Sequence, residues 1–177
     1  MPSLEDSNFH RTVTLLCAHN EDGAMGIVIN RPLELKLGKV LQDLEIESAD
    51  ESTADAIDRF PVLEGGPVQR ERGFVIHQPT GEWESTLIVG NDIGIATSRD
   101  ILKSIANGQG PDRALIALGY AGWAAGQLEH EVLNNAWLSG PADSSIIFDT
   151  PYDERWAGAT RLLGVDPSQL VGGAGHG

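Results

Sequence analysis

The sequence is poor in the residues that cross-link a chain or carry it through a membrane. Its 177 residues include one cysteine, Cys17, so no disulfide can form within the chain. No apolar run approaches the ~20 residues that a membrane-spanning helix needs. The acidic, polar start MPSLEDSNF differs from a signal peptide. We therefore expect a cytoplasmic protein in a reducing compartment, with no membrane as a partner.

Basic residues are scarce as well. The chain has 12 lysines and arginines against 26 aspartates and glutamates, which gives a formal net charge of -14. A field of this sign repels nucleic-acid phosphates and anionic lipid surfaces. We expect no direct nucleic-acid binding, and the partners left open are another protein or a small-molecule ligand.

Motifs that hold cofactors are missing too. The five histidines stand in no zinc-binding spacing, and neither a P-loop, a GxGxxG fingerprint nor a GxSxG elbow occurs. We predict no metal and no cofactor, and specifically that His77 is not a metal ligand. Cys17 and His19 would share one face of a strand about 7 Å apart, too far for a hydrogen bond, so Cys17 is expected to act as a small buried hydrophobe.

Periodic apolar residues predict strands early in the chain and helices later. Residues 12–18 and 25–29 flank a turn at residues 20–23 and predict a hairpin. Further strands are expected at 60–63, 73–77, 85–89, 93–97, 114–118 and 145–148, and helices at 37–44, 97–108, 126–138 and 150–164. Without a regular βαβ alternation, the pattern indicates an α+β domain with a mixed or antiparallel sheet. We expect one domain over residues 1–170 and a disordered tail over 171–177.

The acidic stretch EIESADESTADAID, residues 45–58, predicts a different kind of segment. Its carboxylates repel one another and few apolar residues are present to anchor it, so we expect residues 47–58 to be mobile and solvated.

Glu129 stands out on the helix predicted at 126–138. At 100° per residue it falls inside the apolar arc of Leu128, Val132 and Ala136, which predicts a largely buried carboxylate. Such a group is costly without a partner, and Arg99, then Arg31, then backbone N–H groups of residues 119–126 are the expected partners. Two interpretations stay open: a structural anchor, or a catalytic acid or base.

The glycine-rich stretch GYAGWAAG, residues 119–126, has two interpretations as well. A loop between a buried strand and a helix is a place for a phosphate, but this one lacks the P-loop ending and carries glutamates beside it. Close packing of the helix on the strand is the alternative.

Other polar and glycine-rich pieces are predicted at the ends of elements, where binding sites are built. The ligand-cleft candidates are Asn30, Arg31, Gly65, Gly66, Arg72, His77, Ser98, Arg99, Tyr120 and Trp123, with Glu129 as the catalytic candidate.

Several phrases together resemble one family. They include GAMGIVINRP, GGPV, RGFVIH, TSRDIL and GYAGWAAGQLEHE, and they run in order from Pro2 to about Leu163. The chain resembles the AlgH/YqgE family of bacterial proteins. The resemblance implies an α+β fold with a bifurcated sheet, part of it closed into a small barrel, surrounded by helices. It also implies a short apolar strand ahead of the opening MPSLED phrase, and a link to regulation, since members are labelled transcriptional regulators.

Three functions follow from these observations. The first is a regulator that acts indirectly, through a partner, because the charge disfavours contact with DNA. The second is an enzyme or small-molecule binder, with a cleft between the glycine-rich loops. The third is an interaction module with an exposed apolar patch that includes Tyr120, Trp123 and Trp156.

Overall fold

The computed structural model describes residues 11–47, 56–80, 83, 87–90, 92–97 and 99–166. The predictions for Ser98 and for the tail over residues 171–177 concern residues outside these ranges. The strands are β1 (Thr14–Asn20), β2 (Gly23–Val28), β3 (Val62–Glu64), β4 (Val68–Gln78), β5 (Leu87–Val89), β6 (Ile93–Ala96) and β7 (Arg113–Ala124). The helices are α1 (Leu37–Asp43), α3 (Arg99–Ala106), α4 (Gln127–Leu133), the π-helical turn η1 (Ser145–Asp149) and α5 (Tyr152–Leu162).

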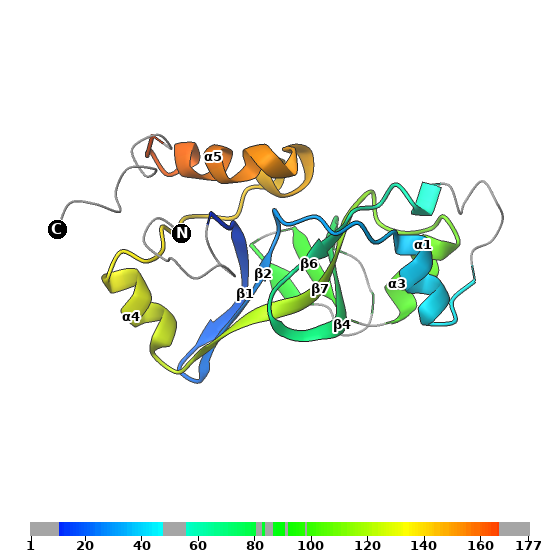
Figure 1. Cartoon of the computed structure of the whole chain (residues 1–177), viewed down its shortest axis with the longest axis horizontal. Helices are drawn as coiled ribbons and strands as arrows, with labels where there is room; N and C mark the ends of the chain where they lie inside the picture. The colour runs from blue at the N-terminus through cyan, green and yellow to red at the C-terminus, as the bar shows by residue number, and fades with distance from the viewer. Residues whose placement is uncertain are drawn as a thin grey trace.

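The seven strands form one sheet in the order β1-β2-β7-β4-β6-β5, with β3 paired to β7 off this path. The β3–β7 pair is parallel and the other pairs are antiparallel. The edge strands β1 and β5 contact one another, so the sheet nearly closes into a barrel. Figure 1 shows the helices around it, with α5 along one side and α4 and α1/α3 at opposite ends. The predicted α+β fold with a bifurcated, partly closed mixed sheet is confirmed.

The sheet forks along one edge of β7. On that edge β3 pairs with residues 116–118 of β7, and β2 pairs with residues 121–124. Gly65 lies between the two: its N–H donates to the Leu118 carbonyl and its carbonyl accepts from the Val28 N–H, both at 2.8 Å. The opposite edge of β7 is occupied by β4. All of the fork therefore depends on β7.

Three glycines permit the backbones to meet at this fork. A Cβ on Gly66 would lie 2.1 Å from the Tyr120 carbonyl carbon, and one on Gly65 would lie 2.3 Å from the Gly119 carbonyl oxygen. Gly119 has a φ of +81°, and its own Cβ would lie 2.4 Å from the Gly66 oxygen. Any side chain would collide with backbone here. The glycines of GGPV and of GYAGWAAG are therefore needed for the same close contact between the chain after β3 and strand β7.

The core follows the alternation of the strands. On β7, Ala114 and Ile116 face the cluster that α1 and α3 cover, whereas Leu115 and Ala117 face the barrel interior. The predicted strand at residues 114–118 is thus confirmed, with its first four residues buried on both faces of the sheet and Leu118 half-buried. The predicted hairpin at residues 12–29 is also confirmed, with its turn held by the Asn20 side chain accepting from the Asp22 N–H at 2.8 Å.

Helix α5 is held to the barrel by a buried arginine. Arg155 is 2% exposed; its Nη1 donates to the Ile29 carbonyl at the end of β2, and its Nε donates to the Thr150 carbonyl at 2.9 Å. Its guanidinium also lies over the Tyr152 ring, 4.5 Å from the centroid. Burial lowers the pKa of Arg155 from its ordinary value. Pro151 is the N-cap residue of α5, and the Thr150 hydroxyl before it donates to the Ser145 carbonyl at 2.9 Å.

The strand predicted at residues 145–148 is wrong, since this segment is the helical turn η1. Asp143 explains the difference: its side chain accepts from the Ile146 N–H and its carbonyl accepts from the Ile147 N–H, both at 3.1 Å. A side chain that accepts backbone N–H groups in this way starts a helical turn, which here buries Ile147.

The acidic segment at residues 47–58 is anchored at its described end. Residues 48–55 lie outside the described residues. Ile57 is buried in the core, and the Asp58 carboxylate accepts from the Gly38 N–H at 3.1 Å. The expectation that residues 47–58 are mobile, with few apolar residues to anchor them, is therefore wrong at the C-terminal end of the segment.

Within the described part of the chain, no helix has the length and apolar character needed to cross a membrane.

The glycine contact at the fork leads to a first prediction. Gly119→Ala should lower the free energy of unfolding by about 3 kcal/mol or more, because the new Cβ adds a backbone collision to the strain of a positive φ. Gly108 has a similar φ of +74° with nothing within 4 Å, so Gly108→Ala should cost only the strain, about 1 kcal/mol. Urea denaturation measures both, and equal losses would contradict the collision.

Candidate functional site: an open acidic hollow beside helix α4

Strand β7 delivers α4 to the tip of the β1–β2 hairpin. Pairing of Gly23 with Ala124 places the hairpin turn beside the last residue of β7. Gly126, with φ +75°, then turns the chain into α4, and the Gln127 side chain accepts from the Ala124 N–H at 2.9 Å. Leu128 is buried against Ala121 and Trp123. The loop predicted at residues 119–126 is wrong, because β7 continues through Ala124. The phosphate interpretation therefore loses its loop, whereas the close-packing interpretation agrees with the backbone contacts of Gly119.

Helix α4 ends earlier than residue 138, where the sequence predicts its end. Asn135 adopts φ 59°, and the N–H groups of Asn135 and Ala136 donate to the carbonyls of Val132 and Glu131 at 3.1 and 2.9 Å. This pair of hydrogen bonds around a residue in the left-handed conformation is a Schellman C-cap. It turns the chain back, so that Trp137 packs edge-on against Trp123 with ring centroids 5.6 Å apart.

The reversal leaves two aliphatic residues of α4 outside. Leu133 is 82% exposed and Val132 is 38% exposed, while Ala136 is buried. We call Val132 and Leu133 the α4 apolar face. The interaction-module hypothesis predicted an apolar patch of Tyr120, Trp123 and Trp156 instead. That patch is wrong, since Trp123 is buried and the other two rings are half-buried.

Glu131 holds this end of the molecule together from inside. Its Oε1 accepts from Trp137 Nε1 at 3.0 Å and from Trp123 Nε1 at 3.4 Å. One carboxylate oxygen thus ties α4, the segment after it and β7 to each other.

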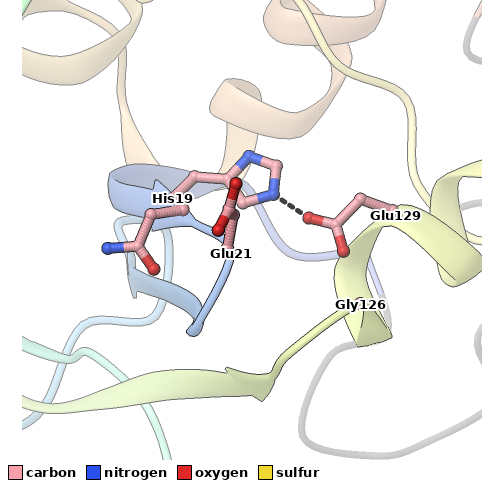
Figure 2. A pocket seen from close by; sticks show the side chains of 5 residues that line it. His19, Glu21, Gly126 and Glu129 are labelled. Carbon is pink, nitrogen blue, oxygen red and sulfur yellow. Dashed lines mark hydrogen bonds and ion pairs between the residues drawn. The ribbon is translucent and has the colours of Figure 1, made fainter.

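Glu129 points outward and meets His19 of β1. Its Oε1 and His19 Nε2 form a hydrogen-bonded ion pair across the gap between hairpin and helix (Figure 2). The pair lines an open hollow of about 530 Å³ whose other lining residues are Asn20, Glu21 and Gly126. The hydrogen bond from His19, with the backbone N–H of Glu129, holds the pKa of this carboxyl below its ordinary 4.5.

The predicted burial of Glu129 is wrong, since its side chain is 45% exposed. The prediction placed Glu129 within an apolar stripe of Leu128, Val132 and Ala136, which requires a helix that continues through Ala136. Helix α4 has only two turns and ends at Leu133. Arg99 is not its partner: Arg99 Nη2 donates to the Leu44 carbonyl at 2.6 Å, at the opposite end of the molecule (Figure 1). The second choice, Arg31, lies beside β3, where its carbonyl accepts from the Glu64 N–H.

The cleft candidates occupy separate places, and of the whole predicted set only Glu129 lines the hollow. Gly65 and Gly66 face the backbone of β7. Asn30 bridges strands, accepting from the Val13 N–H and donating to the Arg11 carbonyl, both at 2.9 Å. Arg72 and Tyr120 both contact the Phe74 ring, the first by a cation–π contact and the second edge-on.

His77 lies inside the molecule, with 0% exposure. Its Nδ1–H donates to the Pro79 carbonyl at 3.0 Å, Trp83 packs edge-on 5.1 Å away, and Gly94 leaves room for the ring. Its Nε2 has no hydrogen-bond partner among the described residues. Burial lowers the pKa of His77 below 6.5, and the Pro79 bond offsets this only in part. The imidazole is thus a neutral core group.

Cys17 is also unsuited to a role as nucleophile or metal ligand. Its thiol donates to the Leu15 carbonyl at 3.4 Å, and burial raises its pKa to about 12. A thiol that stays protonated at neutral pH is a poor nucleophile and a poor metal ligand. Across the described residues, no three histidine, cysteine or acidic side chains gather as a metal site would require.

The sequence did not predict three features of this candidate site: His19 as a partner of Glu129, Glu21 in the hollow, and the exposure of Leu133. His19 and Glu129 are 110 residues apart, and the β1–β2 and β2–β7 registers together bring them close. The Asn134-Asn135 pair was a usable signal for the helix end, because asparagine accepts the left-handed conformation that closes a helix.

The fold and the hollow define a class: an α+β protein with a forked, nearly closed sheet and a short helix presented at its tip. The model of the AlgH-like family matches residues 1–168, and the chain belongs to this family. It is 55% identical over 176 residues to a UPF0301 protein of Nitrosococcus oceani, covering 99% of this chain and 92% of that relative.

Solved structures agree with this assignment. The solution structure of the AlgH protein from Pseudomonas aeruginosa is 49% identical, with a TM-score of 0.79, covering 100% of this chain and 92% of that one. A crystal structure of a Corynebacterium diphtheriae protein shares the fold at 19% identity, with a TM-score of 0.68 and coverages of 96% and 84%.

The His19–Glu129 pair leads to a prediction on pH. In an NMR titration the Glu129 carboxyl should have a midpoint below 4.5, and His19→Ala should move it upward. Since the folded-state pKa is lowered, the pair stabilises the fold above pH 4.5 and this contribution is lost as pH falls through the folded-state pKa. His130→Ala, on the same helix, should leave the midpoint unchanged; a shift there but none in His19→Ala would contradict the pairing.

His77 gives a prediction of the same sign by another route. With its folded-state pKa lowered, the unfolded chain binds its proton more readily, so stability is full above pH 6.5 and falls as pH drops below it. The slope from this one group should approach about 1.4 kcal/mol per pH unit at most. His77→Phe should flatten the slope of the unfolding free energy, whereas the exposed His130→Gln should not. An unchanged slope in His77→Phe would show that other groups titrate.

Proposed function

We propose that the protein is an interaction module that acts indirectly in bacterial regulation, by binding another protein through the α4 apolar face. The observation that carries this proposal is the exposure of Leu133, the highest among the exposed large hydrophobic residues of the described chain. Val132 and Leu133 are adjacent exposed aliphatic residues on a rigidly held helix, and together they offer a surface on which an apolar side chain of a partner can pack.

The setting of α4 supports this function. Leu128 underneath and the Glu131 bonds to two tryptophans hold the helix in place, so its outer face is presented without a further ordering cost. The hollow next to it is open, unlike the enclosed pockets that bury most of a small ligand. The net charge of -14 disfavours the DNA backbone as the partner.

We further propose that the protein works in the cytoplasm. Its one cysteine is a half-buried free thiol with a raised pKa, a state that suits a reducing compartment.

The test uses a photo-crosslinking amino acid placed at position 133 in bacterial cells. Leu162 on α5, 60% exposed, is the matched control position. We expect a discrete protein adduct at 133 and none at 162. With the crosslinked partner purified, Leu133→Asp should weaken binding by about tenfold and Leu162→Asp should not. Equal labelling at both positions, or specific retardation of DNA by the protein in a gel shift at physiological salt, would overturn the proposal.

A second candidate function rests on the His19–Glu129 pair. An imidazole bonded to a carboxylate at the wall of a hollow is an arrangement used for proton transfer, and it favours small-molecule binding or catalysis there. A thermal-shift screen with nucleotides and metabolites discriminates the candidates. A compound that raises the melting temperature of the wild type but not of Glu129→Gln favours the second; its absence across a broad library weakens it.

A further inference from the structure

The surface around α4 combines an apolar face with carboxylates of one sign. Val132 and Leu133 lie three and four residues after Glu129, so they are its neighbours on the helix surface. Glu129 in turn shares the hollow with Glu21 of the hairpin turn (Figure 2). Asp22, the next residue of that turn, is exposed as well. The apolar face and the acidic hollow are therefore one continuous surface.

No lysine or arginine belongs to the segments that form this surface. Residues 12–30, which supply the hairpin, and residues 114–154, which supply most of β7 and all of α4, contain no lysine or arginine. Four arginines border these segments. Arg11 lies over the Trp156 ring, Arg113 pairs with Asp149 at 3.1 Å, and Arg155 donates to backbone carbonyls, while Arg31 lies beside β3. The other ion pairs of the described chain use lysine or arginine, whereas Glu129 has only His19, which is a cation only when protonated.

We propose that this surface binds a basic amphipathic segment of a partner protein. An apolar side chain of that segment packs on Leu133 and Val132. A lysine or arginine about one helical turn away enters the hollow and pairs with Glu129 and Glu21, displacing His19. The hollow of about 530 Å³ has room for such a head group. This inference rests on the proposed function and adds the chemistry of the partner.

The chemistry of this surface favours this occupant over others. Nucleic acid and anionic lipid would meet Glu21, Asp22 and Glu129 with like charge. A second copy of this chain would do the same, because a two-fold interface built on this surface places the same acidic patch on both sides. A cationic, partly apolar segment satisfies the carboxylates and covers Leu133 at the same time.

The experiment measures fluorescence anisotropy of labelled synthetic peptides with the full-length protein. The probe is an amphipathic leucine/lysine peptide of about 16 residues, long enough to form a helix. Two matched peptides separate the contributions: one with glutamate for each lysine, and one with serine for each leucine. We expect the leucine/lysine peptide to bind at least about tenfold more tightly than either, and a rise in salt from about 50 to 300 mM to weaken it several-fold.

Variants locate the binding. Leu133→Ser and Glu129→Gln should each weaken the leucine/lysine peptide by about fivefold or more. Leu162→Ser and Glu34→Gln change an exposed leucine and an exposed glutamate elsewhere, and should leave it unchanged. Equal effects from both pairs of variants would mean attraction to the overall charge and would overturn the inference. Self-association that Leu133→Ser abolishes, without peptide binding, would assign the surface to a second copy and overturn it too.

The two proposals fail in different ways. A crosslinked adduct at position 133 without any preference for the leucine/lysine peptide would contradict the basic-segment inference but not the interaction module. So would an adduct with a partner whose contact surface is acidic. The absence of an adduct sinks the module itself.

Discussion

The approach of Gly66 to the backbone of β7 is the constraint on which the rest of the structure depends. With no Cβ at Gly65, Gly66 or Gly119, the chain after β3 can lie against β7 at a separation that no side chain allows. Gly65 can then bond to both Leu118 and Val28, so one edge of β7 serves β3 first and β2 afterwards. Because β2 pairs only with the far end of β7, the hairpin tip extends out to α4. The position of the hairpin tip beside α4 thus follows from the absence of side chains at the fork of the sheet.

Two carboxylates of α4, two residues apart, have taken opposite roles. Glu131 faces inward and accepts from two indoles, whereas Glu129 faces outward and has only an exposed imidazole. The Schellman turn at Asn135 decides this division, because it folds Trp137 back over Trp123 and gives Glu131 its second donor. A longer helix would have carried Val132 and Ala136 along one buried stripe. The short helix instead buries Ala136 and leaves Leu133 in solvent.

The sequence predicts what is set by local periodicity and fails where distant pairing decides. The hairpin, the apolar face of α3 and the buried run at 114–118 are periodic signals, and they were right. β7 continues through GYAGWA because β2 and β4 supply partners there, which no local propensity reveals. The segment at 145–149 is apolar enough for a strand, but Asp143 caps it as a helical turn. At the site, Glu129 is exposed because α4 ends at Leu133, while its partner His19 depends on that same long-range pairing.

Lysine and arginine are absent from the two segments that form the surface around α4, residues 12–30 and 114–154, whereas Glu21 and Glu129 share its hollow. Local charge of one sign orients an approaching cationic segment before contact, which raises the association rate more than the final affinity. On the proposed binding mode, affinity then comes from Leu133 and from the desolvated pairing at Glu129. The carboxylates select a partner of positive charge. The α4 apolar face, which Glu131 and the two tryptophans hold in place, then keeps the partner bound.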